Sequence, residues 1–156
     1  MGVEVEREAE AIACPDALKH NEVHVMNLID VARKKVLFPA NLTLLHEDQT
    51  FDEQKQRALI RWLMNRGVDG FYVGGSTGEG PLLTTDIRRQ LIKTVVDEVN
   101  HRLPVICYIG YADTLQSIDL AQYAEDVGAD GISAVPPYYY PFGFDEVYGY
   151  YKAISE

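Results

Sequence analysis

The chain has 156 residues, of which 47% are hydrophobic, and this is enough for one compact domain. Its formal net charge of −10, with no basic run longer than residues 33–35, argues against binding to nucleic acid, whose recognition depends on clustered Lys and Arg. No apolar stretch is long enough to span a bilayer and the N-terminus lacks a secretory pattern, so we expect a cytoplasmic protein with no membrane partner.

Residues 1–30 differ from the rest and are predicted to be a weakly structured N-terminal extension. His20 and His24 have the i, i+4 spacing of a helical metal site. However, Asn21 stands where the zinc-protease pattern requires Glu, so no metal is expected. The two cysteines of the chain lie far apart in the sequence and are expected to be free thiols.

From residue 36 onward, short apolar runs alternate with segments of helical spacing. Residues 36–43 are predicted to form a strand, and residues 52–65 a helix. A second strand is predicted at residues 70–73, followed by a helix that Thr85 caps. The apolar positions expected to face inward in that helix are Ile87, Leu91, Val95 and Val99.

The second half of the chain continues in the same order. Residues 104–109 are predicted to form a third strand, and Asp113 with Gln116 resembles the capping box of the next helix. A fourth strand is predicted at residues 130–135, and Asp145 begins the last helix. The positions expected to face inward are Ile118, Ala121, Ala124 and Val127 in the first of these helices, and Val147, Tyr148, Tyr151 and Ile154 in the second.

Four strand–helix units therefore follow one another, which indicates an α/β fold. The strands are continuously apolar, a pattern typical of parallel strands buried on both faces. Residues 67–70 and 128–131 both read Gly-x-Asp-Gly, where a helix ends and a strand begins, and the first glycine suits a left-handed helix end. These patterns fit a (β/α) barrel and a doubly wound sheet equally well.

Parallel α/β proteins place their function at the carboxyl ends of the strands. The second strand ends in Gly-Gly-Ser-Thr-Gly-Glu, residues 74–79, where glycines expose backbone N–H groups and Ser76 and Thr77 add hydroxyls. Such a loop can hold a carboxylate without a formal positive charge. It is neither a Walker loop, because Glu79 replaces the lysine, nor a dinucleotide fingerprint. A plain glycine turn is an equally good interpretation of the spacing.

The fourth strand ends in Pro-Pro-Tyr-Tyr-Tyr-Pro-Phe, residues 136–142. Tyrosine can pass a proton or stack on a ligand, and prolines fix the direction of a loop. An aromatic packing cluster or a subunit interface explains the composition equally well.

Taken together and in this order, the two loops resemble the N-acetylneuraminate lyase and dihydrodipicolinate synthase family, and more closely its lyase branch. The resemblance runs from about residue 36 to residue 156 and includes the Gly-x-Asp-Gly lead-in to the second strand. It implies a (β/α)8 TIM barrel, of which residues 31–156 are the N-terminal half with the first four βα units. It also implies a homo-oligomer, a homotetramer in this family.

The resemblance implies a class I aldolase, in which a lysine forms a Schiff base with the keto carbon of the substrate. Its lyase branch cleaves N-acetylneuraminate to N-acetylmannosamine and pyruvate without a cofactor. Thr77 would bind the substrate carboxylate together with Ser76, and Ser76 would also join a hydroxyl relay. Tyr139 matches the relay tyrosine that family members insert into a neighbouring subunit's site.

The sequence also departs from the family. Leu44 and Leu45 follow Thr43 where the family has Pro-Phe, and a whole barrel needs about 250 residues. The Tyr-Asn-x-Pro motif is absent, and no lysine lies at a predicted strand end, so we expect a truncated chain without the Schiff-base lysine. The alternatives are another 2-keto acid aldolase or dehydratase, such as dihydrodipicolinate synthase, a non-catalytic half-barrel that self-associates, and a doubly wound anion-binding domain.

Overall fold

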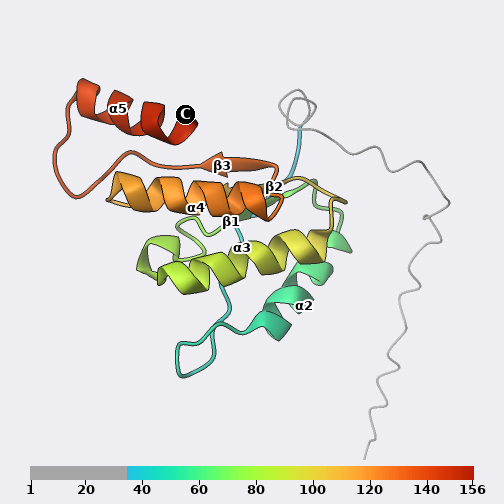
Figure 1. The fold of residues 1–156 in the computed structure, drawn as a ribbon. Helices are drawn as coiled ribbons and strands as arrows, with labels where there is room; N and C mark the ends of the chain where they lie inside the picture. The colour runs from blue at the N-terminus through green and yellow to red at the C-terminus, as the bar shows by residue number, and fades with distance from the viewer. Residues whose placement is uncertain (1–34) are drawn as a thin grey trace, which may run out of the picture.

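The computed structural model describes residues 35–156 (Figure 1). The predicted extension over residues 1–30, with His20 and His24, lies outside the described residues. The elements in chain order are α2 (Glu53–Met64), β1 (Phe71–Val73), the 3₁₀ helix η1 (Gly80–Leu82), α3 (Thr85–Val99), β2 (Val105–Tyr108), α4 (Thr114–Asp126), β3 (Gly131–Ser133) and α5 (Phe144–Ser155). Among them, no helix combines the length and apolarity needed to cross a bilayer.

The sheet confirms the predicted parallel α/β architecture. Its three strands lie in the order β1-β2-β3 and all run parallel, with Phe71 opposite Val105 and Ile106 opposite Gly131. The helices follow the same order, because α2 packs on α3, α3 on α4 and α4 on α5 (Figure 1). A doubly wound sheet reverses its strand order and covers both faces with helices, so this consecutive arrangement favours successive units of a barrel.

The prediction of a strand over residues 36–43 is wrong, because these residues form no regular strand. Only Ala40 forms a bridge with Tyr72, although the two segments run parallel. The N–H of Tyr72 donates to the Pro39 carbonyl at 3.3 Å, and the N–H of Asn41 donates to the Tyr72 carbonyl at 3.1 Å. Since Pro39 has no N–H to donate, the ladder is interrupted at this edge of the sheet.

Both Gly-x-Asp-Gly repeats have the predicted left-handed glycine, with φ of 76° and 88°. Their aspartates have a role that the sequence analysis missed. Asp69 accepts the N–H of Leu37 at 2.7 Å and donates its own N–H to the Leu37 carbonyl at 3.0 Å. Asp130 makes the same pair of bonds with Val105, at 2.8 and 3.0 Å. In each repeat, the aspartate therefore connects the start of its own strand to the start of the preceding strand segment by two hydrogen bonds.

The predicted helix starts are confirmed at one helix and shifted at another. Asp113 accepts the N–H of Gln116 at 2.8 Å and caps α4. The residue that caps α3 is Thr84, whose hydroxyl accepts the N–H of Ile87 at 3.3 Å, and not Thr85. Both threonines fit a cap, and the residue with extended backbone takes the role.

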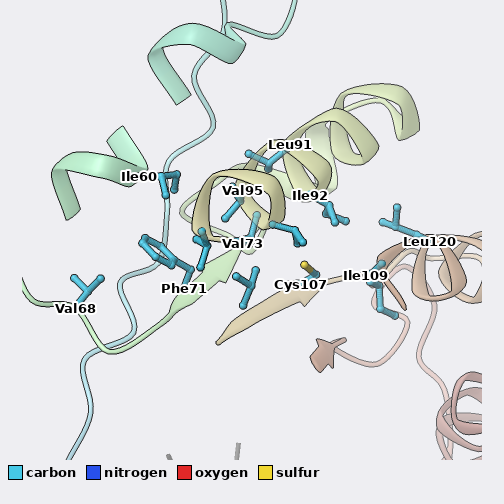
Figure 2. Close-up of a cluster of buried hydrophobic side chains, with 14 residues drawn as sticks. Ile60, Val68, Phe71, Val73, Leu91, Ile92, Val95, Cys107, Ile109 and Leu120 are labelled. Atoms are coloured by element: carbon cyan, nitrogen blue, oxygen red, sulfur yellow. The ribbon is translucent and has the colours of Figure 1, made fainter. Parts of the chain in front are cut away.

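The core lies between α3 and the strands, and Figure 2 shows its side chains gathered there. The predicted faces of α4 and α5 are partly wrong. Leu120 is buried instead of Ile118, and Tyr150 is buried whereas Tyr148 is 59% exposed. The two helices meet at a buried polar contact, in which the Tyr150 hydroxyl lies 2.9 Å from the Ser117 hydroxyl.

Asn41 is expected to destabilise the fold. It is 3% exposed, and within residues 35–156 neither polar atom of its side-chain amide has a hydrogen-bond partner. Replacing it with the similarly sized leucine should raise the free energy of unfolding by about 1–2 kcal/mol, because a buried unsatisfied group is removed. Urea denaturation measures this change. The charged variant Asn41→Asp serves as a control and should lower the stability, and an Asn41→Leu variant no more stable than wild type would contradict the assignment.

Cys107 is a free thiol at 0% exposure, and burial raises its pKa to about 12. At pH 8 only about one molecule in ten thousand would carry the reactive thiolate. In a Cys14→Ser variant, whose remaining cysteine is Cys107, a thiol reagent should label the native protein very slowly and the urea-unfolded protein fast. If the native protein is labelled as fast as the unfolded protein, this part of the core opens readily.

Candidate functional site

The loop after β1 is held in one conformation by its glycines. Gly74 has a φ of 72°, which a side chain disfavours. A Cβ on Gly78 would lie 2.8 Å from the Asn41 carbonyl oxygen, and one on Gly80 would lie 1.7 Å from the Gly74 carbonyl oxygen. Backbone therefore passes so close to backbone that only glycine fits at these two positions.

Hydrogen bonds close the same loop. The Thr43 hydroxyl donates to the Gly78 carbonyl at 2.6 Å, so the segment at residues 36–43 holds the loop in place. The N–H of Glu79 donates to the Ser76 carbonyl at 3.0 Å, and the N–H of Gly80 to the Gly75 carbonyl at 3.1 Å. From the sequence, Thr43 was predicted only as the end of a strand, because the sequence does not show that it lies opposite the loop.

Ser76 and Thr77, the predicted carboxylate ligands, are both exposed at the tip of this loop. Within residues 35–156, neither their backbone N–H groups nor their hydroxyls have a hydrogen-bond partner. A fixed backbone with two adjacent free amides and two hydroxyls is suited to an anion, because each group can donate to it at little cost in ordering.

The carboxyl ends of β1 and β3 are joined by a pair of hydroxyls that the sequence analysis missed. The Tyr72 hydroxyl lies 2.9 Å from the Ser133 hydroxyl. The Tyr72 ring also covers the loop, since a Cβ on Gly75 would lie 2.6 Å from it. Neighbouring Tyr108 is 4% exposed, and burial raises the pKa of its phenol while the positive charge of Arg88 lowers it. The raised pKa keeps the Tyr108 phenol neutral at neutral pH.

Among the described residues, no hydrogen bond links Tyr139, the other predicted site residue, to Ser76 or Thr77. It is 74% exposed and packs edge-on against Tyr140, with 4.9 Å between the ring centroids. An exposed tyrosine of this kind is available to a second molecule, as the predicted role requires.

None of the lysines of the described part of the chain belongs to a strand, although Lys152 lines a groove together with Ser133, the last residue of β3. Lys35 precedes the first strand segment, and Lys55, Lys93 and Lys152 belong to α2, α3 and α5. In the same residues, no group of three or more His, Cys, Asp and Glu side chains is placed to hold a metal ion.

A groove of about 500 Å³ lies between β3 and α5, and no residue of the glycine loop lines it. It is lined mainly by apolar side chains, including Ile109, Ile132 and Ile154. Ile132 is 42% exposed although it belongs to the sheet. The groove therefore marks uncovered apolar surface beside the unpaired edge of β3.

Comparison with known proteins extends the similarity over most of the chain. The model of the dihydrodipicolinate synthetase family matches residues 33–156. The N-acetylneuraminate lyase of Enterobacter sp. is 39% identical over 117 residues, which are 75% of this chain and 39% of that enzyme. The chain thus spans about two-fifths of the length of such relatives.

Solved structures of the same family are similar to this chain over a comparable share of its length. The protein CdNal from Clostridium difficile, solved in complex with mannosamine, is 36% identical with a TM-score of 0.75, over 78% of this chain and 42% of that one. A prophage protein of the dihydrodipicolinic acid synthase family from E. coli, solved with pyruvate, is 31% identical with a TM-score of 0.75, over 77% and 40% of the two chains. The chain belongs to the dihydrodipicolinate synthetase family.

Proposed function

We propose that residues 35–156 form the first four βα units of a (β/α)8 aldolase barrel and that its glycine loop, residues 74–79, binds the carboxylate of a 2-keto acid. The observation that carries this proposal is the pair of unpartnered amides and hydroxyls at Ser76 and Thr77 within the described residues. The prophage relative solved with pyruvate supports the choice of ligand.

The reaction we propose is that of N-acetylneuraminate lyase, a carbon–carbon lyase that releases pyruvate and N-acetylmannosamine without a cofactor. The loop would fix the carboxylate, so that the keto carbon is presented to a Schiff-base lysine that acts as electron sink. Ser76 would pass a proton through a hydroxyl relay, and Tyr139 would complete that relay in a neighbouring subunit of a homo-oligomer.

We place the Schiff-base lysine outside residues 35–156, since no lysine there belongs to a strand. The apolar groove beside β3 supports an incomplete barrel, because a further βα unit would cover Ile132. Borohydride reduction in the presence of pyruvate should therefore leave no covalent adduct on residues 35–156, and mass spectrometry of the digested protein would detect such an adduct. A stable adduct on Lys35, Lys55, Lys93 or Lys152 would contradict this placement.

The double variant Ser76→Ala/Thr77→Val tests the carboxylate site. Each hydroxyl that donates to a charged group contributes about 1.5–3 kcal/mol, so pyruvate affinity should fall at least about tenfold. Calorimetric or NMR titration measures the affinity, and Ser155→Ala, an exposed serine on α5, is the matched control. Unchanged pyruvate affinity in the double variant would exclude the loop as the site.

Two further candidates remain. Dihydrodipicolinate synthase activity, or that of another 2-keto acid aldolase or dehydratase, uses the same carboxylate loop, and assays of a complete barrel with each substrate distinguish these activities. The exposed Ile132 and its groove instead favour a non-catalytic half-barrel that self-associates. A monodisperse monomer in sedimentation would count against that candidate.

A further inference from the structure

Arg88, on the sheet-facing side of α3, is a buried cation that the sequence analysis left unexplained. Its side chain is 1% exposed, and among residues 35–156 no carboxylate pairs with it. Its Nη2 donates to the Tyr108 carbonyl at 2.8 Å and its Nη1 to the Gly110 carbonyl at 3.1 Å, while Nε has no partner in the described part of the chain. Burying a charge without a counter-charge is costly, so this guanidinium needs an explanation.

The guanidinium lies next to the glycine loop. The Tyr108 carbonyl oxygen that it binds is 3.8 Å from the position of a Cβ on Gly74, the first residue of the loop. The Tyr111 ring lies against the guanidinium, with 4.1 Å from its carbon to the ring centroid. Tyr111 is itself held, because its N–H donates to the Ser117 hydroxyl at 2.9 Å.

The position of the Arg88 guanidinium affects the electrostatic potential at the glycine loop. Parallel strands present carbonyl oxygens at their carboxyl ends, and these partial negative charges oppose the binding of a carboxylate. The Arg88 guanidinium donates hydrogen bonds to two such carbonyl oxygens, those of Tyr108 at the end of β2 and of Gly110 just beyond it. The loop has no Lys or Arg of its own and contains Glu79, in a chain with a net charge of −10. A buried charge is screened little by solvent and acts over several ångströms.

We propose that Arg88 is a positioning residue that provides the positive potential for carboxylate binding at Ser76 and Thr77. It does so without contacting the substrate, by neutralising the strand-end carbonyls beside Gly74 and fixing their positions. This inference rests on the proposed function of the loop. It predicts that Arg88 distinguishes a charged ligand from its neutral isostere, which a residue with a packing role alone would not do.

The experiment compares pyruvate with pyruvamide, which replaces the carboxylate by an uncharged amide. The dissociation constant of each is measured by NMR titration of wild type, Arg88→Met, Arg88→Gln and Arg88→Lys. Arg89→Met is the matched control, because Arg89 is the next residue of α3 but is 37% exposed and paired with Asp119 at 2.6 Å. Circular dichroism verifies that each variant is folded.

Arg88→Met and Arg88→Gln should weaken pyruvate binding about tenfold, with pyruvamide changed less than about twofold. Arg88→Lys keeps the charge and should stay closer to wild type, and Arg89→Met should match wild type. An equal loss for both ligands, or a Lys variant as weak as the Gln variant, would overturn the proposal and leave Arg88 a packing role. If Arg88→Met does not fold, the Gln and Lys variants still decide.

The two proposals fail in different ways. If Ser76→Ala/Thr77→Val loses pyruvate while the Arg88 variants bind it as wild type does, the loop site stands and the role of Arg88 is wrong. If wild type binds no pyruvate, the proposed function fails and the role of Arg88 fails with it.

Discussion

Gly80→Ala should destabilise the protein by about 3 kcal/mol and remove pyruvate binding. The added Cβ would lie 1.7 Å from the Gly74 carbonyl oxygen and 2.8 Å from its carbon. Both obstacles are backbone atoms at the end of β1, so no side chain can rotate away and the loop itself must move. Urea denaturation measures the loss of stability, and titration with pyruvate measures the loss of binding.

Gly149→Ala is the matched control for this change. Gly149 lies inside α5, and a Cβ there would meet no atom within 4 Å. Alanine is a better helix former than glycine, so this variant should gain up to about 1 kcal/mol. A Gly80→Ala variant as stable as wild type would mean that the loop is not as tightly closed as the structure shows.

Asp130→Ala should cost about 2 kcal/mol, whereas Asp69→Ala should cost less than about 1 kcal/mol. Both aspartates accept a backbone N–H at the start of the adjacent strand segment, at 2.8 and 2.7 Å. The difference lies in the donor. Val105 is 2% exposed, so its N–H would lose its partner in a buried place, whereas Leu37 is 58% exposed and water can replace the aspartate.

Thermal or urea unfolding of the two variants, measured side by side, tests this difference. Asp130→Asn keeps a hydrogen-bond acceptor and should recover most of the loss. Equal costs for the two alanine variants would contradict the assignment of the effect to the buried N–H of Val105.

Periodicity and turn chemistry predicted most of the fold. The helical spacing of residues 52–65 and the glycines of the two repeats located α2 and the strand starts within a residue or two. Strand order could not be predicted in this way, because pattern alone does not say which strands are neighbours. The structure decides it through the consecutive pairing of β1, β2 and β3.

The errors have a common physical cause, which is partnering that the sequence does not display. The segment at residues 36–43 is apolar enough for a strand, but Pro39 interrupts its ladder. Helices α4 and α5 bury Ser117 and Tyr150 against each other, with 2.9 Å between their hydroxyls, and a rule based on apolar residues does not select a serine. Arg88 was missed for the same reason, because a charge at a core position reads as exposed.

The candidate site was predicted in part. The glycine spacing located the loop, and the resemblance to a family assigned Ser76, Thr77 and Tyr139. The parts from distant segments, Thr43 and the pair of Tyr72 and Ser133, depend on tertiary contacts and follow only from the structure. The glycines also predicted exposed backbone N–H groups in the loop, and within residues 35–156 those of Ser76 and Thr77 have no hydrogen-bond partner.

The most direct test of the carboxylate site is a ¹H–¹⁵N NMR titration of the wild-type protein with pyruvate. We expect the amide signals of Ser76 and Thr77 to move first and furthest, because their N–H groups are the proposed donors, with smaller changes at Gly75 and Gly78. Amide signals of the loop that stay in place while pyruvate shifts resonances elsewhere, or shifts none, would contradict it.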